Sequence, residues 1–400
     1  MKRFIRLTII LVIATSLIVQ CKQYLILVSL DGFRWDYAHR GLTPNLEQVR
    51  EKGVSAMSLR PVFPTLTFPN HYSIISGMYP ENHGIISNEF FNPIAEEQYS
   101  YRQADLMSDS KWYLGEAFWE TAERNGIKTA TFFWPGSDVS LPYRRPTYLK
   151  KYDSKIPYKE RVNQVIEWLK LPEKERPFFI TLYFEEVDIK SQEYGVNSKE
   201  TNQAIKLLDD LIGYLQNSLK ATEISDSVNI IIVSDHGMTD IYRDNTIDIN
   251  KILSGKRCKV QNYGAFAMVE AQEDLEEIYT YLKKNEYNYK VYKKSEVPEY
   301  LHFSKHPFIS SLIILPENGW FITEKTESYS LTQKAAHGYD NEWSDMHGIF
   351  FAIGPAFKTG YSCGTLWNID INPLMCKIFG ISPRSNIDGK LDRIGFILKR

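Results

Sequence analysis

Three aspartates and two histidines have the residue types and positions expected of ligands for divalent cations. Asp31, Asp188 and Asp235 each follow the end of an apolar segment, and His236 is next to Asp235 in a turn closed by glycine. His337 lies in a loop sequence without apolar periodicity. Zinc and harder divalent ions take carboxylate and imidazole ligands from separate elements. Each residue alone would be interpreted as a hydrogen-bonded turn residue, but together they favour a metal centre.

A threonine in a proline-containing segment has the setting of a nucleophile. Thr67 stands two residues before Pro69, and proline is favoured in the first turn of a helix, so we expect Thr67 just before a helix. A metal-bound hydroxyl there could attack phosphorus, and a phosphate would meet backbone N–H groups at the positive helix end. The alternative interpretation is that Thr67 is only the N-cap of that helix.

Buried strands must position these residues. Continuous apolar runs, typical of strands buried on both faces, cover 24–30, 177–184 and 228–233. Helical patterns alternate with them at 44–52, 114–125, 159–170 and 199–220. This alternation predicts an α/β fold with a doubly wound, mostly parallel sheet. Because the carboxyl ends of parallel strands meet at one edge, we expect Asp31, Asp188 and Asp235 to lie together.

A second region differs from this pattern. Residues 258–330 predict strand, helix, strand and strand, which indicates a small α+β insertion, or cap. The main sheet resumes near 348–353.

The N-terminus predicts a secretory signal peptide. Basic residues at 2, 3 and 6 precede an uncharged, mostly apolar run at 7–21. That run is shorter than the roughly 20 residues that cross a bilayer, and it fits the apolar part of a signal over residues 1–20. An uncleaved membrane anchor and a lipidated Cys21 are the alternatives. We therefore expect an exported chain, periplasmic, secreted or lipid-anchored, whose folded part spans residues 21–400.

Composition excludes several other classes. The 400 residues are 43% hydrophobic and 24% charged, which is typical of a folded globular protein and not of a disordered chain, a collagen or a coiled coil. The formal net charge of −2 does not support a nucleic-acid-binding surface. Apart from Cys21, the chain has three cysteines, too few for a disulfide scaffold.

Five motifs carry a resemblance to a known family. They are LDGF at 30–33, PTLTFPNHYSIISGMYPENHGI at 64–85, WPGSDV at 134–139, SDHGM at 234–238 and HGYDN at 337–341. In this order they resemble the nucleotide pyrophosphatase/phosphodiesterase family (type I phosphodiesterases) of the alkaline phosphatase superfamily, and the short form is similar to bacterial members. The resemblance implies an alkaline phosphatase-like three-layer α/β/α sandwich, with 21–400 as the catalytic domain.

The resemblance also implies roles for individual residues. One metal site would be Asp31, Thr67, Asp235 and His236. The second would be Asp188, His337 and the position of Gln192, where the family pattern E-P-D-x-x-G-H has histidine and this chain does not. A carboxamide oxygen binds zinc poorly, so we expect a weaker second site there, with Glu193 as an alternative ligand.

Further residues would bind the substrate. By the same resemblance, Asn88 donates to a phosphoryl oxygen, and Phe68 and Tyr152 stack on a nucleobase. Tyr152 is equally compatible with an ordinary aromatic rim. The remaining histidines near the motifs are expected to be structural, namely His71, His83 and His347.

The activity implied is that of an exported metal-dependent phosphodiesterase or nucleotide pyrophosphatase. Thr67 would attack phosphorus, form a phosphothreonine and release nucleoside 5′-monophosphates, assisted by two divalent ions for which zinc is expected. The expected partner is a small nucleotide or phosphodiester substrate, and no specific nucleic-acid binding is expected. The chain would be attached to a membrane only through a lipid at Cys21. Two alternatives remain: a phosphodiesterase for choline-type lipid head groups, and a binding protein with a degenerate metal site.

Overall fold

The core of the molecule is an eight-stranded sheet. The computed structural model describes residues 23–324 and 333–399, so the predicted signal peptide and Cys21 lie outside the described residues. The strand order is β19-β2-β18-β9-β1-β8-β6-β7. In that order the strands are Tyr361–Cys363, Val54–Ala56, Phe350–Ile353, Val228–Val233, Tyr24–Leu30, Phe179–Phe184, Thr129–Phe132 and Tyr148–Lys150.

Most of this sheet is parallel. Strand β1 pairs in parallel with β8 on one side and β9 on the other, and β6 continues the parallel set to β7. Only β18 runs antiparallel to its neighbours β9 and β2. Strands β1 and β9 have the bounds predicted from their apolar runs, and every residue in both is buried. The mostly parallel α/β sheet is thereby confirmed.

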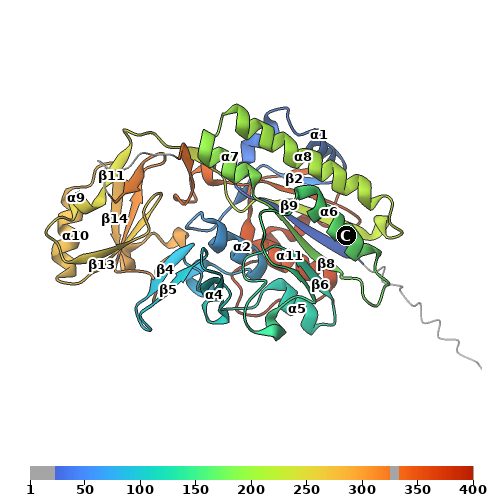
Figure 1. Ribbon diagram of the computed structural model, residues 1–400, viewed down its shortest axis with the longest axis horizontal. Coiled ribbons are helices and arrows are strands. Elements are labelled where there is room, and N and C mark those ends of the chain that lie inside the picture. Colours follow the sequence, from blue (N-terminus) through green and yellow to red (C-terminus); the bar gives the residue numbers. More distant parts are fainter. Residues whose placement is uncertain (1–22, 325–332, 400) are drawn as a thin grey trace, which may run out of the picture.

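Helices cover both faces of the sheet (Figure 1). Alternate residues of β1 divide between two cores: Leu25 and Leu27 face one, and Ile26 and Val28 face the other. The first core is closed by α2 (Thr67–Ser76), α5 (Phe118–Arg124) and α11 (Ile371–Phe379). The second is closed by α1 (Pro44–Lys52), α6 (Tyr158–Lys170) and α8 (Lys199–Leu219). The predicted three-layer α/β/α sandwich is confirmed.

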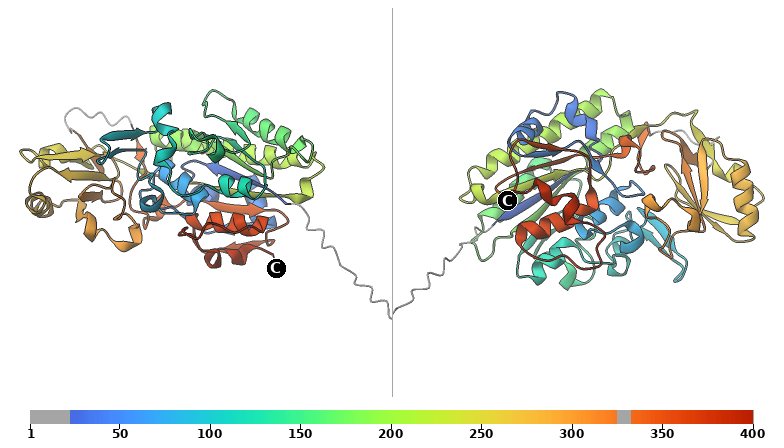
Figure 2. Two further views of the ribbon diagram at one scale, coloured as in Figure 1. Left: turned by 90° about the horizontal axis from the view of Figure 1, so that it is seen from below. Right: turned by 180° about the vertical axis from the view of Figure 1, so that it is seen from behind.

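A smaller lobe stands at one end of the sandwich (Figures 1 and 2). Its four-stranded sheet has the order β12-β13-β15-β14, with bounds Cys258–Gln261, Ala267–Ala271, Leu312–Pro316 and Tyr289–Lys293. Helix α10 (Leu275–Lys284) packs on this sheet in a core of its own. Ile247 and Ile249, which precede residue 258, belong to the same core.

Two element ends differ from the sequence-based bounds for local reasons. Helix α5 begins at Phe118 instead of residue 114, because the Glu120 carboxylate accepts from the backbone N–H of Ala117 and caps the helix there. The sequence pattern predicts a strand over 129–134, but β6 ends at Phe132 because Phe133 has φ of 64°. Within the described residues, no helix is long and apolar enough to cross a membrane.

Candidate active site

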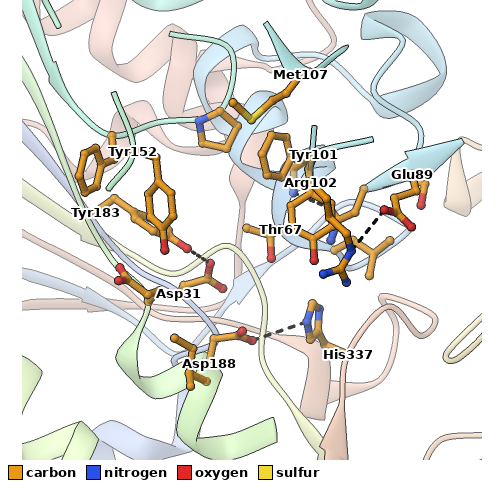
Figure 3. A pocket seen from close by; sticks show the side chains of 18 of the residues that line it. Asp31, Thr67, Glu89, Tyr101, Arg102, Met107, Tyr152, Tyr183, Asp188 and His337 are labelled. Atoms are coloured by element: carbon orange, nitrogen blue, oxygen red, sulfur yellow. Dashed lines mark hydrogen bonds and ion pairs between the residues drawn. The ribbon is translucent and has the colours of Figure 1, made fainter. Parts of the chain in front are cut away.

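The carboxylates predicted to meet at one edge of the sheet do so. Asp31 directly follows β1, Asp235 comes two residues after β9, and Asp188 lies in the first turn of α7 (Glu186–Tyr194), which follows β8. Strands β8, β1 and β9 are neighbours and parallel, so the three acids lie at one edge of the sheet. Figure 3 shows two of them, Asp31 and Asp188, beside the same pocket. Asp31 and Asp235 are buried, and Asp188 is partly exposed.

Two glycines permit this convergence. Gly32 has φ of +65°, and a Cβ on it would lie 2.8 Å from Cα of Asp188. A Cβ on Gly237 would lie 2.1 Å from the carbonyl oxygen of Asp345. A side chain on Gly32 would push its turn away from Asp188, and one on Gly237 would push the turn after β9 away from the loop at 345–347.

The first group of candidate ligands surrounds one point. His236 Nε2 lies 3.1 Å from Asp235 Oδ2 and 3.5 Å from Asp31 Oδ1. The Thr67 hydroxyl oxygen lies 3.4 Å from the same nitrogen. His236 Nδ1 is 2.9 Å from the Gly237 carbonyl, which can only accept, so Nδ1 carries a proton and Nε2 is the ring nitrogen that faces the two carboxylates.

The chemistry of this first group fits a divalent cation. Asp31 Oδ1 and Asp235 Oδ2 are buried without a hydrogen-bond partner. Their opposite oxygens are satisfied, by the Tyr183 hydroxyl at 2.5 Å and by the Gly32 N–H at 3.2 Å. Buried carboxylate oxygens without a hydrogen-bond partner are costly unless a cation lies beside them, and the neutral imidazole of His236 could bind the same cation through Nε2.

The electrostatics point the same way. Burial raises the pKa of the Asp31 carboxyl well above its usual range, and the Asp235 and Asp188 carboxylates add to the rise. Burial also raises the pKa of Asp188 to about 6. Three acids at one sheet edge therefore concentrate negative charge that a bound cation would neutralise.

Thr67 is the first residue of helix α2 and not its cap. The N-cap is Leu66, so the helix begins earlier than Pro69 suggested, and the interpretation of Thr67 as a mere N-cap residue is wrong. Asn88 lies beside it: its Oδ1 accepts from the backbone N–H of Phe68 at 3.0 Å. That contact fixes the carboxamide so that its amino group remains as a donor toward the pocket, which Asn88 lines.

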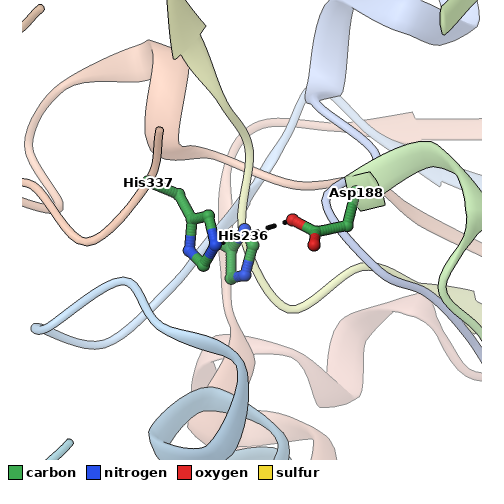
Figure 4. Close-up of side chains that lie close together, drawn as sticks. All are labelled: Asp188, His236 and His337. Atoms are coloured by element: carbon green, nitrogen blue, oxygen red, sulfur yellow. Dashed lines mark ion pairs between the residues drawn. The ribbon is translucent and has the colours of Figure 1, made fainter. Parts of the chain in front are cut away.

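The second group of candidate ligands, Asp188, Gln192 and His337, is held together by direct side-chain contacts. The rings of His236 and His337 stack with centroids 3.6 Å apart, and Asp188 Oδ1 lies 3.5 Å from His337 Nε2 (Figure 4). Burial lowers the pKa of His337 to about 3, so its imidazole is neutral. Gln192 reaches both residues through its nitrogen, 2.6 Å from Asp188 Oδ2 and 3.2 Å from His337 Nε2. The side chain of Glu193 is 53% exposed and lies 3.7 Å from the Lys190 ammonium.

A pocket of about 820 Å³ opens over both groups (Figure 3). Both predicted base-binding residues line it. The Phe68 ring lies 5.5 Å from that of Tyr101, and the Tyr152 ring lies 5.0 Å from that of Phe133. Tyr152 is 55% exposed, so one face of its ring is available to a ligand.

Comparison with known proteins assigns the chain to a family. A family model described as type I phosphodiesterase / nucleotide pyrophosphatase matches residues 25–340. The chain belongs to this family. All residues that line the pocket or form the two ligand groups of this type I phosphodiesterase / nucleotide pyrophosphatase lie inside the matched range.

Curated relatives extend the match. Ectonucleotide pyrophosphatase/phosphodiesterase family member 1 from Homo sapiens is 35% identical over 386 residues, which are 94% of this chain and 42% of that protein. The chain thus spans less than half the length of this relative. A bis(5′-adenosyl)-triphosphatase from Xenopus laevis is 35% identical over 364 residues, covering 90% of this chain and 79% of that protein.

Solved structures of the family have the same fold. Human ectonucleotide pyrophosphatase/phosphodiesterase 5 matches with a TM-score of 0.90 at 32% identity, over 94% of this chain and all (100%) of that one. The murine protein of the same name, as an inactive threonine-to-alanine variant in complex with AMP, gives 0.89 at 30% identity and the same coverage, 94% and 100%. The predicted alkaline phosphatase-like fold class is confirmed.

Two residues that the sequence analysis did not place in the site contact its acids. His71, predicted to be structural, is held by the Ser29 hydroxyl at 2.8 Å and the Thr67 carbonyl at 2.9 Å, and its Nδ1 also lies 3.3 Å from Asp235 Oδ2. Its position one helical turn after Thr67 was a usable signal, since residues i and i+4 share a helix face. Tyr183, which donates to Asp31, lies inside an apolar strand, and no sequence pattern distinguished it.

The other two histidines predicted to be structural, His83 and His347, form hydrogen bonds with residues outside the two ligand groups. His83 Nε2 pairs with the Ser73 hydroxyl at 2.9 Å, and His347 is held by Ser58 and the Asn341 carbonyl. Both tie loops to the core.

Proposed function

We propose that this chain is a metal-dependent phosphodiesterase and nucleotide pyrophosphatase that forms a phosphothreonine at Thr67 and releases nucleoside 5′-monophosphates. The observation that carries this proposal is the Thr67 hydroxyl at the start of α2, 3.4 Å from His236 and beside two unpartnered buried carboxylate oxygens. Two relatives support the substrate class. One is named a bis(5′-adenosyl)-triphosphatase, and an inactive threonine-to-alanine variant of another was solved with AMP.

The first cation would be held by Asp31, Asp235, His236 and Thr67. When bound there, a divalent cation supplies positive charge that acidifies the threonine hydroxyl and neutralises a phosphoryl oxygen. Zinc is the proposed ion, because two carboxylates and an imidazole are ligands that it accepts.

The chain's own groups then carry out two displacements. Thr67 Oγ1 forms a bond to phosphorus while the bond to the leaving oxygen breaks, and water later displaces the threonine oxygen from phosphorus. The Asn88 amino group donates to a phosphoryl oxygen, because Phe68 N–H holds the other end of the amide. Backbone N–H groups in the first turn of α2 favour the same negative charge.

One assay of the purified chain tests this function against its two alternatives. Bis(4-nitrophenyl) phosphate, ATP and glycerophosphocholine are supplied separately, with added zinc or with chelator. We expect zinc-dependent hydrolysis of the nitrophenyl diester and of ATP, with AMP as the nucleotide product. Preferential hydrolysis of glycerophosphocholine would instead indicate a head-group phosphodiesterase, and zinc binding without turnover of any substrate a binding protein.

The role of Tyr152 gives a second test. Tyr152→Ala should raise KM for nucleotide substrates about 5- to 150-fold, because stacking on a base contributes about 1–3 kcal/mol and acts equally in ground and transition states. The nitrophenyl diester, which has no nucleobase, should be affected less. Tyr143→Ala removes a tyrosine that is 79% exposed and does not line the pocket, so it is the matched control. Equal losses for both substrates would contradict a base-binding role.

Export is part of the proposal. The human relative is named an ectonucleotide pyrophosphatase/phosphodiesterase, and the N-terminal pattern predicts a cleaved leader. N-terminal sequencing of the mature protein should therefore find a chain that begins at or near Cys21. A soluble cytoplasmic chain that retains Met1 would contradict export.

A further inference from the structure

Gln192 is held in one orientation by three contacts. It lies one turn after Asp188 on α7, so the two side chains share a helix face. Its nitrogen donates to Asp188 Oδ2 at 2.6 Å and lies 3.2 Å from His337 Nε2. Its oxygen accepts from the side-chain nitrogen of Gln333 at 3.1 Å.

The histidine fixes which way the amide must face. His337 Nδ1 lies 2.9 Å from the Thr65 carbonyl oxygen, which only accepts, so the proton is on Nδ1 and Nε2 is an acceptor. Both N–H groups of Gln192 therefore have acceptors, and its oxygen has a donor. The reversed amide would place two acceptor oxygens 2.6 Å apart, at the Asp188 contact.

This arrangement does not fit a second cation. An amide nitrogen offers no lone pair to a metal, and here its N–H groups occupy the lone pairs of Asp188 Oδ2 and His337 Nε2. One carboxylate oxygen in this group, Asp188 Oδ1, remains unpartnered. In the first group, two unpartnered carboxylate oxygens and Nε2 of His236 converge, and no amide of the described residues occupies them.

We propose that this chain holds a single tightly bound divalent cation, in the first group, and that the Gln192 carboxamide takes the place of the second. The N–H groups of the amide hold Asp188 and His337 together, as a shared cation would. The inference rests on the proposed function only for the identity of the first cation site, and it concerns stoichiometry, not turnover.

The test is zinc content. The full chain is stripped with chelator, loaded with excess zinc, desalted and analysed by atomic spectroscopy. We expect one zinc per chain for the wild type and two for Gln192→His, because histidine supplies the nitrogen lone pair that the amide lacks. A calorimetric titration of the wild type should show any second zinc binding on the order of 100-fold more weakly, or more, than the first.

Two further variants locate the ion. Asp235→Asn should lose the single zinc of the wild type. Combined with Gln192→His, it should retain one zinc, in the second group. Circular dichroism and thermal melts verify that each variant is folded, and the wild-type stoichiometry alone stays decisive if a variant fails to fold.

Two equally tight zinc ions in the wild type would overturn the inference, as would a Gln192→His chain that still holds one. A wild type that holds one zinc but hydrolyses no phosphodiester would contradict the proposed function and leave the inference standing. The two failures are thus distinguishable.

Discussion

Thr67→Ala should lower turnover of phosphodiesters about 10³-fold or more while the chain keeps its zinc. The substitution removes the only hydroxyl beside His236 Nε2 among the described contacts, so no covalent phosphoenzyme can form. Asp31, Asp235 and His236 are unchanged and continue to supply two carboxylates and an imidazole. The measurement is kcat with bis(4-nitrophenyl) phosphate, together with zinc content by atomic spectroscopy.

Thr67→Ser is the matched control. Serine keeps a hydroxyl at the first position of α2, so a measurable part of the turnover should remain, and a phosphoserine should be trapped on rapid acid quenching. Wild-type turnover in Thr67→Ala would show that another group attacks phosphorus. Loss of zinc from that variant would show instead that the threonine oxygen is needed to bind the ion.

Arg161→Ala should reduce the free energy of unfolding by about 3–5 kcal/mol, because it leaves a buried carboxylate without its partner. Arg161 has no exposed surface, and its guanidinium binds Glu185 through two hydrogen bonds of 2.7 and 2.9 Å. It also donates to the Tyr183 carbonyl and lies over the rings of Phe133 and Tyr158. Equilibrium unfolding in urea gives the difference.

Lys206→Ala is the control for this measurement. Lys206 and Asp210 form an exposed pair one helical turn apart, with side chains 60% and 55% exposed, so its loss should change stability by less than about 0.5 kcal/mol. Arg161→Lys should fall between the two, since lysine keeps the charge but not the two-pronged contact. A loss below about 1 kcal/mol for Arg161→Ala would show that water or another cation compensates Glu185.

The sequence predicted the sheet best where both faces are buried. Strands β1 and β9 read as unbroken apolar runs because the sandwich covers them on both sides, so their bounds followed from hydrophobicity alone. Helix and strand ends that depend on a single local contact could not be predicted from hydrophobicity. The cap that Glu120 provides to α5 and the left-handed turn at Phe133 are such cases.

The candidate site was predicted as a set of residues and not as a geometry. Motif order brought Asp31, Asp235 and His236 together, since strand ends meet at one edge. The orientation of Gln192 depends on Gln333 and His337, which are distant in sequence, and no pattern in the chain joins the three. Tyr183 was hidden for a related reason, since its hydroxyl reaches Asp31 from the neighbouring strand.

The position of β1 between β8 and β9 has a consequence for how the protein folds. Its partners lie far along the chain, so this apolar strand stays unpaired until residues 179–184 have been made, and such non-local pairing is slow and prone to aggregation. The acids brought together at its end repel one another when the pairing completes. A cation that binds only the closed edge would favour folding by about 2.7 kcal/mol at a free concentration of 100 times Kd. Metal supply where the chain folds would then influence how much folded protein accumulates, before any substrate is turned over.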